Sequence, residues 1–317
     1  MTTPTAPAGR DRLRLGTAPD SWGVWFPQDP RQVPWQRFLD EAGEAGYAWI
    51  ELGPYGYLPT DAARLRGELD RRGLRLSGGA VFAGLHKGAD AFDQAVRDCR
   101  QEAELLVAAG ARYLVLLPEL YTDGSNRIAA SELDSAQWTV MTRGMSRLAR
   151  LLHEEYGVVL VFHPHADSHV ETQAQVHRFL DDADPEVVHL CLDTGHISYR
   201  RGDNLEIIRR YPDRIRYVHL KTVDPAVLDR VEADGLTFGD AVPLGAMVEP
   251  GPGAVPAMEP LLAALAALDA DIFTIVEQDM YPCPPEAPKP IAVRTREYYN
   301  GRGVGPRHHG TGNRSTP

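Results

Sequence analysis

Four side chains of types that commonly bind metal ions each stand at the end of a short apolar run. They are His163 in VFHPH, Asp193 in LDTGH, His219 in VHLK and Glu277 in IVEQD. Burying an imidazole or a carboxylate costs several kcal/mol unless the group is paired or bound to a cation. Imidazole nitrogens combined with carboxylate oxygens suit Mn²⁺, Co²⁺, Fe²⁺ or Zn²⁺ better than Mg²⁺ or Ca²⁺. The four residues therefore predict a divalent transition-metal site, with Mn²⁺ or Co²⁺ the preferred ion.

Each of these residues also has a simpler structural interpretation. A single histidine at the end of a strand is commonly a hydrogen-bonded structural group, which applies to His163 or His219 taken alone. Asp193 and Glu277 could cap the helices that follow them, since a carboxylate near a helix N-terminus is favourable by about 0.3–1 kcal/mol. Four ligand-type residues at four strand ends would require four unrelated coincidences, so the pattern favours the metal site.

Three further polar residues beside these apolar runs could transfer protons. His165 lies two residues after His163, and in an extended segment its side chain would point to the same side. Lys221 follows His219 with the same spacing and could act as a base or stabilise an enolate, because an ammonium group beside a bound cation loses its proton easily. Glu51, in the run WIEL, could act as a base, orient a metal ligand or cap a helix.

A second group of residues could contact the substrate. His196 stands three residues after Asp193, a position suited to contacting substrate or supporting a metal ligand. The aromatic residues that follow the first two apolar runs could stack on the C–H faces of a sugar, although they could also pack in the core or in loops. The predicted substrate-binding residues are His196, Trp22, Trp25, Tyr55, His86 and Glu171.

These residues lie in a chain where apolar runs alternate with amphipathic stretches of helical period. The apolar runs span residues 13–18, 48–52, 74–81, 113–117, 158–163, 188–193, 215–220 and 272–277. The amphipathic stretches lie at about 33–45, 60–72, 88–109, 134–156, 172–181, 203–211, 256–268 and 286–300. Eight strand–helix repeats without a break in composition favour a single α/β (β/α)8 TIM barrel over a doubly wound sheet with a second domain. Catalytic residues of such barrels gather at the carboxyl ends of the strands.

The barrel domain is expected to span residues 12–300, between polar tails at 1–11 and 301–317. Both tails are rich in Gly, Pro, Ser and Thr and carry too little apolar surface to offset the entropy of ordering. His308 and His309 lie in the second tail and are not counted toward the site. The connection at about 222–256 is long for a barrel and could form a lid, a binding element or an oligomer contact.

Charge and composition exclude several classes of partner. The 317 residues include 44 acidic and 33 basic side chains, and the formal net charge of −11 disfavours binding to nucleic acid or to an anionic membrane. No apolar run approaches the roughly 20 residues of a membrane span, and the N-terminus lacks the apolar segment of a signal peptide. The sequence therefore predicts a cytoplasmic protein that binds neither nucleic acid nor membranes.

The ordered motifs HPH, LDTGH and VHLK resemble those of the xylose-isomerase-like TIM barrels, the sugar phosphate isomerase/epimerase superfamily. The similarity is greatest to its inosose dehydratase branch, covers most of the chain, and includes GTAPDSWGVWFPQDP and AGYAWIELGPYG. It implies that Asp193, His219 and Glu277 bind a metal. Sugar epimerases of this superfamily usually have a glutamate that doubles as a base at the position of His163, where the dehydratase branch tends to have histidine. Thr222 departs from that branch, which often has aspartate after VHxK.

The resemblance implies a metal-dependent dehydratase of a keto-cyclitol or keto-sugar such as 2-keto-myo-inositol. A divalent ion chelated by the ketone and a neighbouring hydroxyl would stabilise the enolate formed by loss of the adjacent proton, after which the β-hydroxyl would leave. A sugar isomerase or epimerase on the same barrel is the main alternative, and a non-catalytic sugar-binding subunit is another. A phosphodiester hydrolase is disfavoured by the acidic net charge. The expected partner is a small keto-polyol, and the chain could form a homo-oligomer.

Overall fold

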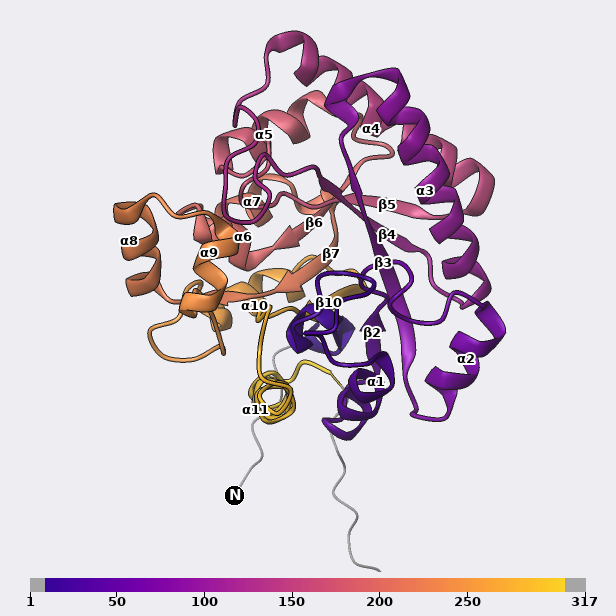
Figure 1. The fold of residues 1–317 in the computed structure, drawn as a ribbon, viewed down its shortest axis with the longest axis vertical. Coiled ribbons are helices and arrows are strands. Elements are labelled where there is room, and N and C mark those ends of the chain that lie inside the picture. Colours follow the sequence, from indigo (N-terminus) through magenta and orange to yellow (C-terminus); the bar gives the residue numbers. More distant parts are fainter. Residues whose placement is uncertain (1–8, 306–317) are drawn as a thin grey trace, which may run out of the picture.

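Eight parallel strands close into a barrel in the computed structural model, which describes residues 9–305 (Figure 1). Around the barrel the strands follow the order β1-β10-β7-β6-β5-β4-β3-β2, so each barrel strand pairs with the one that follows it in the chain. The strands are β1 (Leu13–Thr17), β2 (Trp49–Glu51), β3 (Arg75–Ala83), β4 (Tyr113–Pro118), β5 (Val159–Phe162), β6 (His189–Asp193), β7 (Ile215–Leu220) and β10 (Ile272–Val276). The prediction of a single (β/α)8 barrel is confirmed.

Helices surround the barrel, and each of the eight predicted helical stretches contains one (Figure 1). Local signals fix their ends: Asp134 caps the N-terminus of α4, where its carboxylate accepts the backbone N–H groups of Ala136 and Gln137, and Gly157, with a φ of 63°, caps the C-terminus. No helix within residues 9–305 is both long and apolar enough to cross a lipid bilayer. The eight helices are α1 (Trp35–Glu44), α2 (Ala62–Asp70), α3 (Ala89–Ala108), α4 (Ser135–Tyr156), α5 (Gln173–Asp182), α7 (Asn204–Arg210), α10 (Met258–Ala266) and α11 (Pro288–Asn300).

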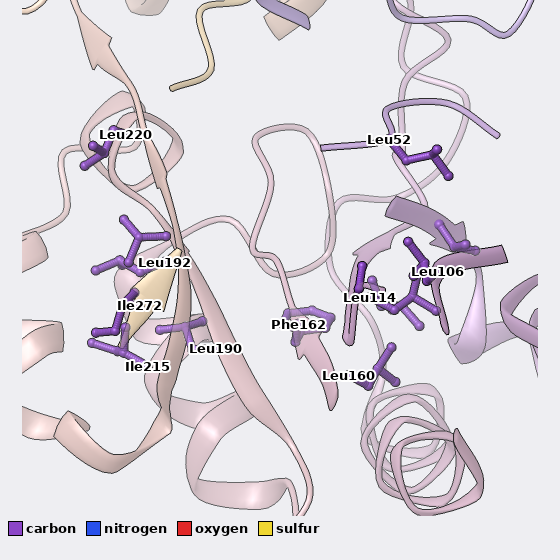
Figure 2. Packing of buried hydrophobic residues seen from close by; sticks show 14 of the residues in the cluster. Leu52, Leu106, Leu114, Leu160, Phe162, Leu190, Leu192, Ile215, Leu220 and Ile272 are labelled. Carbon is purple, nitrogen blue, oxygen red and sulfur yellow. The ribbon is translucent and has the colours of Figure 1, made fainter. Parts of the chain in front are cut away.

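Alternation along the strands separates an outer apolar layer from the barrel interior. Figure 2 shows buried residues of the outer layer, among them Leu160 and Phe162 of β5. The Phe162 ring stacks on Phe179 of helix α5 with ring centroids 3.8 Å apart, whereas Val161 belongs to a separate interior cluster. Because neighbouring residues of a strand face opposite sides, the next residue, His163, returns to the interior. The two-residue period thus carries polar side chains into the barrel mouth.

The long connection between β7 and α10 contains structure that the sequence did not predict. It forms a two-stranded antiparallel sheet of β8 (Thr222–Val223) and β9 (Met247–Val248), together with helices α8 (Pro225–Asp234) and α9 (Phe238–Ala241). Helix α8 lies between the capping residues Asp224 and Gly235, a signal present in the sequence. Helix α6 (Thr194–Tyr199), directly after β6, was also not predicted. In Figure 1, α8 and α9 stand to one side of the barrel.

The predicted boundaries between the tails and the barrel domain lie too far inside the chain. Arg10 was placed in the N-terminal tail, yet its guanidinium is buried, pairs with Glu259 and donates to the backbone oxygen of Arg302 at 2.8 Å. Val304 was placed in the C-terminal tail, but it is fully buried in the outer apolar layer. These contacts join the two ends of the domain. The remainder of the predicted tails, with His308 and His309, lies outside the described residues.

Candidate active site

A cavity of about 830 Å³ opens at the carboxyl ends of the barrel strands, where catalytic residues of this fold gather. Its walls come from loops after several strands and from the insertion between β7 and α10. Seven of the residues singled out in the sequence line its polar part, and they are Glu51, His163, His165, His196, His219, Lys221 and Glu277. The structure therefore gathers most of the candidate catalytic residues in one place.

The four predicted metal ligands lie together. One ligand atom from each of His163, Asp193, His219 and Glu277 falls within 4.8 Å of the others, and all four residues are buried. Asp193 Oδ2 is 3.3 Å from His163 Nε2, and Glu277 Oε2 is 3.0 Å from His219 Nδ1. The pairing of adjacent strands produces this arrangement, because Asp193 on β6 stands directly beside His219 on β7.

His219 is held in an orientation suited to a metal ligand. Its Nε2 atom lies 3.0 Å from Glu51 Oε2, and both side chains are buried. Its Nδ1 atom faces Glu277 and Asp193 without a hydrogen-bond partner. Carboxylates commonly orient metal-binding histidines through the second ring nitrogen in this way. The donor set and the unpartnered nitrogen fit a divalent cation, and Glu51 is placed where it could orient His219.

Negative charge predominates around the cluster. The Lys221 ammonium lies 2.7 Å from Asp279 Oδ2 and 3.2 Å from carboxylate oxygens of both Asp193 and Glu277. Burial alone would lower the pKa of Lys221, but the three carboxylates raise it well above its ordinary value. Asp20 adds a further carboxyl group whose pKa is raised by burial and by Glu277. Such a surplus of buried carboxyl groups favours a bound cation.

His165 and His196 form a neutral pair beside the cluster. Their ring centroids are 3.9 Å apart. Burial lowers the pKa of His165 to about 3, and burial also lowers the pKa of His196 well below its ordinary value. His165 Nδ1 lies 2.6 Å from the carbonyl oxygen of Ala166, which can only accept a hydrogen bond, so this nitrogen carries the proton. The Nε2 atom of His165 therefore carries a free lone pair.

Two of the predicted aromatic residues line the cavity, and one does not. Trp25 and Tyr55 are part of the cavity wall, and Trp25 Nε1 donates to Asp279 Oδ1 at 3.1 Å. The prediction for Trp22 is wrong, because its side chain is fully buried in the core, donates to Glu41 Oε2 at 2.8 Å and packs edge-on against Phe38. Trp22 precedes a glycine with positive φ, Gly23, which turns the chain before Trp25.

His86 and Glu171 do not line the cavity, and the structure corrects their predicted contact with substrate. The His86 ring packs edge-on against His169 with ring centroids 4.5 Å apart. Glu171 is held by Arg200, whose Nε donates to it at 2.7 Å, and by the hydroxyl of Tyr121 at 2.8 Å. An ion pair and hydrogen bonds satisfy this carboxylate, which makes it a structural group.

The cavity-wall residues that sequence reasoning missed include Asp20, Asp279 and Phe238. Asp20 follows β1 and Asp279 follows Glu277 by two residues, so the position after a strand could have indicated both. Phe238 comes from the insertion between β7 and α10, and no local pattern marked it. Its ring centroid is 4.8 Å from that of His196 and 5.2 Å from that of His165.

The fold and the cavity define a (β/α)8 barrel with four candidate metal ligands clustered at its catalytic end. Comparisons with known proteins identify its family. The model of the xylose isomerase-like TIM barrel matches residues 39–297. The chain therefore belongs to this family, and it is an enzyme of the lyase or the isomerase/epimerase type.

Similar proteins agree with this assignment. An inosose dehydratase from Geobacillus kaustophilus (strain HTA426) is 31% identical over 301 residues, covering 90% of this chain and 93% of that protein. Among solved structures, the IolI protein with a binding zinc atom gives a TM-score of 0.66 at 17% identity, covering 90% of this chain and 98% of that one. The probable 3-DHS dehydratase AsbF from Bacillus anthracis gives 0.65 at 16% identity, covering 91% and 99%. At these identities the two structures support the fold alone.

Proposed function

We propose that the protein is a divalent-metal-dependent dehydratase of a keto-cyclitol or keto-sugar, with 2-keto-myo-inositol as the first candidate substrate. The observation that carries the proposal is the buried cluster of His163, Asp193, His219 and Glu277 at the catalytic end of the barrel. The inosose dehydratase relative, which is similar along nearly its whole length, supports the choice of substrate.

The four clustered residues would hold a divalent transition metal such as Mn²⁺ or Co²⁺. When bound, the ion would polarise the ketone of the substrate and stabilise negative charge on its oxygen. Glu51 orients His219 through the ring nitrogen that faces away from the ligand cluster. Trp25 and Tyr55 in the cavity wall offer apolar surface to the substrate ring.

Two residues could carry out the proton transfers. His165 Nε2, unprotonated because Nδ1 holds the hydrogen, would remove the proton next to the ketone. The departing β-hydroxyl needs a proton to leave as water, and the Lys221 ammonium, which the neighbouring carboxylates keep protonated, could supply it. Lys221 Nζ lies 3.3 Å from His196 Nε2, and the His196 ring packs against that of His165, so His196 links the proposed acid to the proposed base. We assign the base role to His165 and the acid role to Lys221.

The proposal is tested by incubating metal-reconstituted protein with 2-keto-myo-inositol and measuring the product by mass spectrometry. Loss of one water, abolished by a chelator and restored by Mn²⁺ or Co²⁺, is the expected result. A product with the mass of the substrate would show an isomerase or epimerase. Activity that survives complete removal of the metal would overturn the metal-dependent mechanism.

A further inference from the structure

The insertion between β7 and α10 places one aromatic side chain directly against the histidine pair of the cavity. The Phe238 ring lies 4.8 Å from His196 and 5.2 Å from His165, centroid to centroid, and stacks over Trp25 at 6.3 Å. Phe238 lines the cavity although only 3% of the residue is exposed. An aromatic ring in the wall of a cavity can contact the C–H groups of a ring-shaped ligand.

The backbone of Phe238 is fixed by a carboxylate from another loop. The Phe238 N–H donates to Asp167 Oδ2 at 2.7 Å. Asp167, from the loop after β5, adopts a φ of 62°, a left-handed conformation that is unfavourable for most residues other than glycine, asparagine and aspartate. Such a conformation persists only where the surroundings determine it.

Those surroundings are a group of polar contacts on Asp167. The Arg200 guanidinium donates to Asp167 Oδ1 at 2.8 Å and also pairs with Glu171. Glu171 in turn accepts the backbone N–H of Asp167 at 2.8 Å and the hydroxyl of Tyr121. Together these four residues form what we call the strap: Asp167, Glu171, Arg200 and Tyr121. They come from the loops after β4, β5 and β6, and they fix Phe238 in the insertion after β7.

A second contact ties the insertion to the loop after β4. The Thr237 hydroxyl donates to the carbonyl oxygen of Gly124. Gly239 packs so closely on Gly124 that a Cβ atom at this position would collide with the same carbonyl group. Residues on both sides of Phe238 are thus anchored, and its backbone cannot move away from the cavity without breaking these contacts.

We propose that Phe238 is a specificity-determining residue that covers the C–H face of a cyclic keto-polyol, and that Asp167 is the positioning residue that sets its ring. The inference deepens the proposed function and rests on it for the substrate class. An open-chain keto-polyol presents no flat C–H face, so Phe238 discriminates between ring and open-chain ligands. Asp167 also borders the cavity, but we expect it to affect ligand choice through the position of Phe238.

The test measures binding, so that it can fail separately from the dehydration reaction. The Mn²⁺-loaded protein is titrated calorimetrically with 2-keto-myo-inositol and with erythrulose, a ketose too short to close a stable ring. Phe238→Ala should raise the Kd for the ring ligand about tenfold and leave that for erythrulose within about twofold. Asparagine tolerates the positive φ at position 167. Asp167→Asn should therefore also raise the ratio of the Kd for the ring ligand to the Kd for erythrulose, but by a smaller factor.

A double variant separates positioning from general damage to the fold. If Asp167 acts through Phe238, adding Asp167→Asn to Phe238→Ala changes the Kd ratio no further. Asp181→Asn is the matched control, since Asp181 pairs with Arg210 at 2.9 Å on outer helices, and it should leave both Kd values unchanged.

Several outcomes would overturn the inference. It fails if Phe238→Ala leaves the ratio of the two Kd values unchanged, or if the effects in the double variant are additive. It also fails if the wild type binds the ring ligand no tighter than erythrulose. Ring selectivity that depends on Phe238 without any loss of water would instead refute the proposed dehydratase activity and leave the role of Phe238 standing.

Discussion

Replacing Glu51 by glutamine should weaken metal binding without removing a metal ligand. In the structure Glu51 Oε2 lies 3.0 Å from His219 Nε2, in a contact that is almost fully buried. The substitution keeps the shape of the side chain but removes its charge. The hydrogen bond to His219 then becomes one between neutral groups, which is roughly half as strong as a charge-assisted one.

The expected loss of metal affinity can be taken from other carboxylates that orient metal-binding histidines. Loss of the group that orients a metal-binding histidine typically lowers metal affinity 10- to 100-fold, or about 1.4–2.8 kcal/mol. Protein stripped of metal should therefore bind Mn²⁺ with a Kd 10- to 100-fold higher in Glu51→Gln than in wild type. Isothermal titration calorimetry, or competition with a chelator of known affinity, measures the difference.

The control removes a carboxylate from the same end of the barrel. Glu119 follows β4, is partly exposed and pairs with Lys87, so Glu119→Gln changes the local charge without touching a histidine. Its Mn²⁺ affinity should stay within about twofold of wild type. An unchanged Mn²⁺ affinity in Glu51→Gln, together with a large fall in kcat, would refute the orienting role. It would indicate instead that Glu51 acts as a catalytic base.

Three other substitutions test separate parts of the molecule. Asp193→Asn should lower the bound Mn²⁺ below one ion per chain by elemental analysis, with an unchanged circular dichroism spectrum. Lys221→Met should lower kcat by about 10²–10⁴-fold with retained metal, as expected for loss of a proton donor; a rise in KM alone would contradict this role. Glu102→Gln should stabilise the fold more at pH 8 than at pH 4.5, as measured by urea denaturation. Burial raises the pKa of Glu102, so the folded state keeps a proton that the unfolded state loses as the pH rises above about 4.3.

The sequence was sufficient to predict that the four ligand-type residues lie together, because a strand has a simple period. Apolar residues at 160 and 162 pack outward, which directs His163 into the barrel, and the same alternation directs Asp193 after Leu192. Equivalent positions on neighbouring parallel strands are adjacent in space, as the pairing of Asp193 with His219 shows. A regular sheet therefore converts sequence position into spatial proximity.

The residues that the sequence did not reveal depend on irregular segments. Trp22 and Trp25 stand three residues apart in one loop, yet Trp22 is buried against Glu41 and Trp25 reaches the cavity. The turn between them, at Gly23, decides which ring enters the core. Phe238 is fixed by Asp167, a residue 71 positions away. No periodicity connects such partners, so tertiary contacts alone place them.

The strand-end part of the cavity consequently tolerates less change in sequence than the part formed by the insertion. The proposed metal ligands stand on or directly after hydrogen-bonded barrel strands, where an insertion or a one-residue shift would turn His163 or His219 away from the cluster. Phe238 belongs to an insertion outside the barrel sheet, and its position depends on side-chain contacts with Asp167 and Gly124. Changes in the insertion can therefore alter which ligand fits above the cluster while the cluster itself stays intact. Substrate choice should vary at Phe238 and the strap, and metal binding should vary at the strand ends.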